Sequence, residues 1–321
     1  MFKHCVLLAL GLALASPSVA SEVRFRSANA IVIDEATGQV LLQKSESVAV
    51  PIASITKLMT AMVVLDAGQS EAEEVRILDE DVDVLKHSHS RIPVGAVLTR
   101  DTLLELALMS SDNRAAAALA RTYPGGIAAF HAATLAKIES LGLHHTTLSE
   151  PTGLSAQNRS SAQDLALVAR AAAQYPEIAR ITSQSSQMVR LDTKDVLFRN
   201  TNALVGRPGW NILLSKTGFT NEAGRCLTMR LELSGRTILM VLLGAADPAR
   251  RTADVMSVLR WASGGAPTYA SARRTRAERG LVNTRNSRML AGDSVPRPIP
   301  VKRVGASPPE RSTHLPGTSA A

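Results

Sequence analysis

The chain has 321 residues, of which 45% are hydrophobic and 20% charged; this is an ordinary globular composition, with enough residues to bury a large core in one or two domains. Aromatic residues make up only 3%, which counts against a platform that stacks sugars or bases, and so against carbohydrate modules and single-strand nucleic-acid binders. Most of the net charge of +8 belongs to the C-terminal residues, and the rest of the chain is close to neutral.

The first residues have the pattern of a secretory signal peptide. Lys3 supplies a positive start, an apolar run extends from Val6 to Ala15, and small residues precede a cleavage position after about Ala20. The apolar run is too short to span a bilayer, and the alternative is a short buried helix. No other segment approaches the roughly eighteen apolar residues of a spanning helix. We therefore expect residues 1–20 to be removed and the mature protein to be soluble and exported to the periplasm.

The next segments predict a hairpin and then an apolar helix. Two runs rich in Val, Ile and Leu, 30–33 and 39–42, flank turn residues at 35–38, which is typical of a β-hairpin. The helix that follows begins near Ser54 and ends at Gly68, because glycine is a frequent C-terminal cap.

The middle of the chain is predominantly helical. Thr99 is a candidate N-cap for an apolar helix, and the polar break Ser-Ser-Asp-Asn at 110–113 separates that helix from the next one. Three further segments have apolar residues at helical spacing: 126–142, 161–175 and 176–183.

Strands return near the end of the chain. The runs 211–220, 225–233 and 236–245 are β-like, and a helix follows at 253–263. One hairpin at the start and three strands at the finish predict a single antiparallel sheet assembled from both chain ends around a helical middle, which is an α/β (α+β) fold. Cys226 lies in the second run as a lone buried thiol, and no Cys/His spacing indicates a metal site.

The last part of the chain differs from the rest in amino-acid composition. After Gly264 it is rich in Pro, Arg, Ser and Gly without periodicity, and from Ala266 onward ten basic residues face three acidic ones. We predict a catalytic or binding domain over 21–264 and a disordered basic tail over 265–321. The tail has the charge to make weak, salt-dependent contact with anionic wall polymers or lipid head groups, or it is merely solvated.

Three polar islands stand in apolar settings. The first is Ser54-Ile55-Thr56-Lys57, in which residues three apart share a helical face, so the serine oxygen and the lysine amine can touch. A buried lysine with a lowered pKa can act as the base that a serine nucleophile needs. Taken alone, the pattern is better explained by a helix cap followed by a surface lysine.

The other two islands are Ser111-Asp112-Asn113 and Lys216-Thr217-Gly218. A serine in the first can relay a proton, and an asparagine amide can hold a peptide bond. Lysine and threonine in the second can bind a carboxylate, and glycine lets a substrate backbone approach the strand. Each island alone also fits an ordinary turn. The order and spacing, roughly sixty and then roughly a hundred residues apart, match the set S-x-x-K, S-D-N, K-T-G of penicillin-binding proteins.

The chain therefore resembles the low-molecular-weight penicillin-binding proteins, the serine D-Ala-D-Ala peptidases, and among them the D-alanyl-D-alanine endopeptidases. The resemblance runs from about Ser27 to Ala262 and includes "LKHSHSRIPVG", "EPTGLS" and "KTGFTNEAGRCL". It implies a β-lactamase/DD-peptidase-like fold, an acyl-enzyme mechanism, peptidoglycan peptide stems as substrate and β-lactams as inhibitors. No metal or organic cofactor is implied.

The resemblance also implies a role for each motif residue. Ser54 would be the acylated nucleophile, Lys57 its general base, and Ser111 a relay of a proton to the leaving amine. The implied substrate-binding residues are Asn113, Lys216, Thr217 and Gly218, with Asn113 on the donor amide and Lys216 and Thr217 on the substrate carboxylate. The backbone N–H groups of Ser54 and Phe219 would form the oxyanion hole.

Two related enzymes remain as alternatives. A D-Ala-D-Ala carboxypeptidase of this group usually carries a second all-β domain and an amphipathic anchor, and the residues after Gly264 show neither pattern, which favours cleavage of D-Ala–diaminopimelate cross-links. A class A-like β-lactamase needs a glutamate to activate water; Glu150 is at a suitable distance, but the following "PTGLS" matches the peptidases, so we interpret Glu150 as structural. A non-enzymatic wall-binding protein is disfavoured because the motifs are intact.

Overall fold

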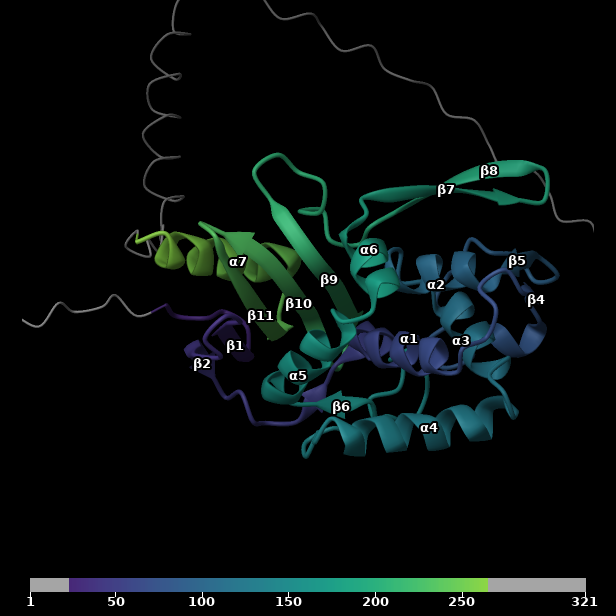
Figure 1. Ribbon diagram of the computed structural model, residues 1–321, viewed down its shortest axis with the longest axis horizontal. Coiled ribbons are helices and arrows are strands. Elements are labelled where there is room, and N and C mark those ends of the chain that lie inside the picture. Colours follow the sequence, from purple (N-terminus) through teal and green to yellow (C-terminus); the bar gives the residue numbers. More distant parts are fainter. Residues whose placement is uncertain (1–22, 265–321) are drawn as a thin grey trace, which may run out of the picture. The chain divides into compact units, whose positions relative to one another are not determined.

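The computed structural model describes residues 23–264, all within one compact unit (Figure 1). The predicted signal peptide and the predicted tail after Gly264 lie outside the described residues. Among the described residues, none of the helices has the length and apolar content that crossing a membrane requires.

A five-stranded antiparallel sheet joins the two ends of the chain, as predicted. Its spatial order is β2-β1-β11-β10-β9, so β9 is an edge strand. The strands are β1 (Asn29–Asp34), β2 (Val40–Lys44), β9 (Asn211–Thr220), β10 (Gly224–Leu233) and β11 (Arg236–Ala245).

Both faces of this sheet are buried, which explains the nearly continuous apolar sequence of β11. Successive side chains point to opposite faces. Leu239 and Val241 therefore join the core under the helical region, while Met240 and Leu242 join a second core with Val255 and Val258 of α7 (Pro248–Ala262). In Figure 1, α7 lies against β10 and β11 of the sheet.

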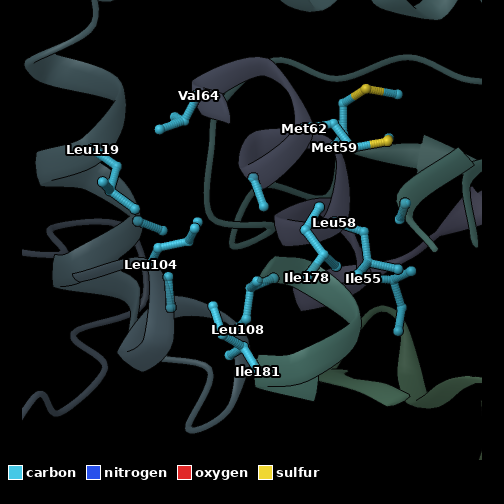
Figure 2. Packing of buried hydrophobic residues seen from close by; sticks show 14 of the residues in the cluster. Ile55, Leu58, Met59, Met62, Val64, Leu104, Leu108, Leu119, Ile178 and Ile181 are labelled. Carbon is cyan, nitrogen blue, oxygen red and sulfur yellow. The ribbon is translucent and has the colours of Figure 1, made fainter. Parts of the chain in front are cut away.

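The helical middle supplies the larger core. Its helices are α1 (Lys57–Asp66), α2 (Arg100–Leu108), α3 (Asn113–Arg121), α4 (Gly126–Ser140), α5 (Ala162–Ala172) and α6 (Pro176–Ser183). Helix α1 is apolar on all sides because it is surrounded: Figure 2 shows Leu58 next to Ile178 of α6, and Val64 on the side that faces Leu104 of α2 and Leu119 of α3. The predicted N-cap Thr99 is confirmed, since its hydroxyl accepts from Thr102 N.

Short elements complete the described chain. They are β3 (Val50–Pro51), the 3-10 turns η1 (Ala53–Thr56) and η2 (Asp79–Asp81), β4 (Glu74–Arg76), β5 (Val97–Thr99), β6 (Arg159–Ser160), β7 (Ser186–Leu191) and β8 (Lys194–Arg199). The β7–β8 hairpin was not expected from the sequence, because half of the residues in each strand are polar and few of its side chains are buried. Cys226 is fully buried in β10 as a free thiol, as expected.

Candidate active site

Ser54 sits in a tight turn rather than at the start of an α-helix. The structure corrects the expected helix start: residues 53–56 form the 3-10 turn η1, and Lys57 is the first residue of α1. Ala53 has a left-handed backbone (φ 48°), and its carbonyl accepts from the Thr56 hydroxyl at 2.8 Å. The chain is thus folded sharply just before Ser54, which leaves the serine partly exposed.

Lys57 lies in contact with three oxygen atoms from three segments. Its Nζ is 2.9 Å from Ser54 Oγ, 2.6 Å from Asn113 Oδ1 and 2.7 Å from the carbonyl oxygen of Thr152. Asn113 and Thr152 are far from Lys57 in sequence, so tertiary packing sets this arrangement. Two of the contacts are carbonyl-type acceptors, which can only receive an N–H. A neutral amine that donates to both has its lone pair left for the Ser54 hydroxyl.

The environment of Lys57 favours that neutral form. The side chain is 1% exposed, and its burial lowers the pKa of Lys57 to about 8. The charges of Glu150, Asp112 and Asp83 oppose this effect without cancelling it. About a tenth of Lys57 is therefore uncharged at pH 7, far more than for an ordinary lysine, and this neutral form can act as a general base.

Ser111 and Asn113 flank the start of α3. Ser111 has a left-handed backbone (φ 61°), and Asp112 caps the helix by accepting from Ala115 N. Asn113 Nδ2 donates to Ser88 Oγ at 2.7 Å while Asn113 Oδ1 accepts from Lys57. The amide is therefore held at both ends, and the orientation of its oxygen toward Lys57 is fixed.

Lys216 is a second buried lysine, 1% exposed. Its Nζ donates to Ser111 Oγ at 2.8 Å and to the carbonyl oxygen of Thr217 at 3.1 Å. Burial holds the pKa of Lys216 well below its usual value, and the positive charge of Lys57 adds to the effect. Lys216 thus joins the second and third islands, although its amine is directed to Ser111 and does not stand free in solvent.

The third island brings the edge strand against the Ser54 turn. A Cβ on Gly218 would lie 2.9 Å from the carbonyl oxygen of Ile52 and 3.1 Å from Ser54 N, so only glycine fits without displacement. The sequence predicted that this glycine admits a substrate backbone; in the structure its first neighbour is the backbone of the protein's own turn. Phe219 follows directly and is 47% exposed. The Thr217 hydroxyl donates to Thr201 Oγ1 at 2.7 Å.

Glu150 belongs to a turn that supports the site. Its carboxylate accepts hydrogen bonds from the Thr152 hydroxyl and from the backbone N–H groups of Thr152, Gly153 and Ser155. These bonds fix the Thr152 carbonyl that contacts Lys57. The arrangement agrees with the structural interpretation of Glu150 made from "EPTGLS".

The structure thus brings the three islands together, and it adds residues that sequence reasoning missed. Thr152, Ser88 and Thr201 contact the motif residues, but no sequence pattern around them indicates a chemical role. Thr152 and Ser88 do lie in the segments "EPTGLS" and "LKHSHSRIPVG", which the resemblance to the family includes.

A cavity of about 290 Å³ opens beside Asn113 and Thr152, with exposed Leu85 and Ile127 in its lining. Within the described part of the chain, no cluster of three His, Cys, Asp or Glu side chains could hold a metal.

A family model described as D-alanyl-D-alanine carboxypeptidase matches residues 16–247. The chain belongs to this peptidase family. The peptidase is 44% identical over 244 residues to a D-alanyl-D-alanine endopeptidase of Pseudomonas aeruginosa, a match that covers 75% of the chain and 79% of the relative. It is 41% identical over 253 residues to a D-alanyl-D-alanine endopeptidase of Escherichia coli (strain K12), covering 78% and 82%. The predicted family is confirmed.

Solved structures confirm the fold of the peptidase. The Streptomyces K15 DD-transpeptidase superposes with a TM-score of 0.70 at 23% identity, over 76% of this chain and 99% of that one. Penicillin-binding protein D2 from Listeria monocytogenes, solved in its cefotaxime-bound form, gives a TM-score of 0.64 at 25% identity, over 75% and 98%. The predicted DD-peptidase-like α+β fold is therefore correct.

Proposed function

We propose that the peptidase is a serine D-alanyl-D-alanine endopeptidase that hydrolyses D-Ala–diaminopimelate cross-links in peptidoglycan through an acyl-enzyme on Ser54. The observation that carries this proposal is the contact between Lys57 Nζ and Ser54 Oγ at 2.9 Å, with two carbonyl-type oxygens occupying the other directions around the amine. The names of the two relatives support the endopeptidase over the carboxypeptidase.

The first half of the reaction is acylation. Lys57 accepts the proton of the Ser54 hydroxyl as Oγ attacks the carbonyl carbon of D-alanine. The negative charge on the carbonyl oxygen is stabilised by the backbone N–H groups of Ser54 and Phe219, which the close approach at Gly218 brings near one another. The bond to the amine of the neighbouring stem breaks. Ser111 gives its proton to that amine and takes up the proton that Lys57 removed from Ser54, so Lys57 is neutral again before hydrolysis.

The second half is hydrolysis. A water molecule attacks the ester carbonyl, its proton leaves through Lys57, and Ser54 regains its hydroxyl. During acylation, Lys216 and Thr217 bind the carboxylate of the departing stem, and Lys216 Nζ also donates a hydrogen bond to Ser111 Oγ. The donor peptide lies between Asn113 and β9. Asn113 binds the donor amide from one side, and the edge strand β9 can pair with the extended donor backbone from the other.

β-Lactams should acylate the same serine. The decisive experiment is exposure of the protein to labelled penicillin, followed by mass spectrometry of its peptides. We expect one label on Ser54 and none in Ser54→Ala. An unlabelled protein at neutral pH, or a label on another residue, would overturn the proposal.

Product analysis separates the endopeptidase from its alternatives. Purified cross-linked muropeptide dimers should be converted to monomers, and release of terminal D-alanine alone would instead identify a carboxypeptidase. Steady-state turnover of nitrocefin should be slow after one acylation event, because Glu150 is engaged by four hydrogen bonds in its own turn; fast turnover would identify a β-lactamase. We also propose that this activity lies in the periplasm, where its proposed substrate is found.

A further inference from the structure

The direction of the bound substrate follows from the proposed function, on which this inference rests. The leaving amine lies near Ser111 and Thr217. The acyl donor must then extend from Ser54 the other way, past Gly218 and along the free edge of β9 toward Thr220. The donor amide passes between Asn113 and this strand edge.

An ion pair stands at the end of that path. Lys86 Nζ pairs with the carboxylate of Glu222, which belongs to the turn between β9 and β10. Lys86 lies two residues before Ser88, whose hydroxyl contacts Asn113. The pair therefore links the wall of the cleft that carries Asn113 with the wall that carries the strand edge, 136 residues apart in the chain.

The pair is positioned for the donor residue that precedes D-alanine. An extended peptide advances about 3.5 Å per residue, so the Cα of this residue lies about 5 Å from the acylated carbonyl. On the strand side, that distance leads from Gly218 past Phe219 toward Thr220, next to the turn that holds Glu222. A side chain three or four bonds long reaches the remaining distance to Lys86 and Glu222.

The chemistry of the pair suits one kind of side chain. In a wall built from diaminopimelate stems, the donor residue before D-alanine ends in an ammonium and a carboxylate on the same carbon. Glu222 can accept from that ammonium, and Lys86 can donate to that carboxylate. The side chains of Lys86 and Glu222 are 36% and 38% exposed, and an ion pair in such a position contributes little stability, so opening it costs little.

We propose that Lys86 and Glu222 form a specificity site for the zwitterionic end of the donor-stem diamino acid. The free protein holds the site closed as an internal ion pair. The bound donor replaces that single contact by two: substrate ammonium on Glu222 and substrate carboxylate on Lys86. Exposed Leu85 lies beside Lys86 in the chain and lines the adjacent cavity, where it can contact the aliphatic part of the donor side chain.

The test compares enzyme variants against donor variants, using the full-length mature protein. The substrates are muropeptide dimers whose donor diaminopimelate is native or amidated at its side-chain carboxylate. The enzymes are the parent, Lys86→Met, Glu222→Gln and the matched control Arg250→Met, which breaks the exposed Arg250–Asp247 pair on α7. The rate of acylation by benzylpenicillin, which carries no diamino acid, is measured for each.

We expect Lys86→Met and Glu222→Gln each to lower kcat/KM on the native dimer about tenfold, as the loss of one charge-assisted hydrogen bond implies. On the amidated dimer, Lys86→Met should have no further effect, while Glu222→Gln should still lower kcat/KM. Acylation by benzylpenicillin should change less than about twofold for either variant, because that ligand does not reach the pair. Arg250→Met should match the parent throughout.

Two outcomes overturn the proposal. Equal losses on the dimer and on benzylpenicillin assign the pair a purely structural role, and equal losses for Lys86→Met on native and amidated dimers exclude recognition of the carboxylate. A parent enzyme that benzylpenicillin acylates but that leaves both dimers intact contradicts the endopeptidase assignment itself, which is a separate failure.

Discussion

Lys57 Nζ lies closer to Asn113 Oδ1, at 2.6 Å, than to Ser54 Oγ, at 2.9 Å. Together with the Thr152 carbonyl, Asn113 uses both N–H groups of a neutral Lys57, so the lone pair has one direction left. The asparagine of the second motif therefore orients the base of the first motif, besides its proposed role in holding the donor amide.

The first prediction concerns the pH dependence of acylation. Lys57 acts as a base only when uncharged, and its pKa is about 8. The rate constant for acylation by benzylpenicillin should therefore rise with pH below about 8 and level off above it. Stopped-flow or quench measurements of this rate constant from about pH 5.5 to about pH 9.5, a range that brackets the pKa, test the expected profile. A flat profile across the range would exclude Lys57 as the base.

The second prediction concerns stability against pH. The pKa of Lys57 is about 8 in the folded protein against 10.5 for an ordinary lysine, so between these values the unfolded chain binds more protons. The free energy of unfolding should rise with pH over that window by about 3 kcal/mol from this group. The destabilisation is fully present below about pH 8. Urea unfolding should show a shallower rise in Lys57→Met, and identical slopes in both proteins would contradict the prediction.

The third prediction concerns Ser88 as a positioning residue. Its hydroxyl is the acceptor for Asn113 Nδ2 at 2.7 Å. Ser88→Ala should lower kcat for muropeptide cleavage about tenfold, because Asn113 loses the partner that fixes its orientation, while Ser88→Thr should restore most of the rate. Ser140→Ala, which removes an exposed hydroxyl on α4, is the control. An equal loss in Ser88→Ala and Ser88→Thr would argue against positioning by the hydroxyl.

The fourth prediction separates backbone strain from contact at Gly153. Gly153 and Gly209 have nearly the same positive φ, 85° and 79°, but a Cβ on Gly153 would lie 2.0 Å from the carbonyl oxygen of Ala53, whereas Gly209 faces open space. Gly209→Ala should cost about 1–2 kcal/mol of stability through strain alone. Gly153→Ala should cost more and should also abolish acylation, because it displaces the Ser54 turn. Thermal unfolding with penicillin labelling tests both; equal behaviour would contradict the contact.

The fifth prediction concerns the basic residues after Gly264. If they hold anionic wall polymers, removal of 265–321 should reduce sedimentation with isolated sacculi at low salt, and added salt should abolish the difference. Cleavage of soluble muropeptide dimers should be unaffected. Unchanged sedimentation at low salt would leave the tail without a binding role.

The helices and strands followed from local patterns because their causes are local. Apolar spacing placed α1 and α3, the Val/Leu-rich runs placed β1 and β11, and Thr99 marked the start of α2 through its own hydroxyl. The β7–β8 hairpin was missed because half of the residues in each strand are polar and few of its side chains are buried. The 3-10 turn at Ser54 was missed because the contact of Gly153 with Ala53 joins segments about a hundred residues apart.

By itself, the sequence determined which chemistry is available: a serine and a lysine three residues apart, two further polar islands in the right order, and a sheet built from both chain ends. Only the tertiary structure decided that Lys57 and Lys216 are both buried and what their amines contact. The physical reason is that a lowered pKa arises from the exclusion of water, and water is excluded by the packing of segments that the sequence keeps far apart.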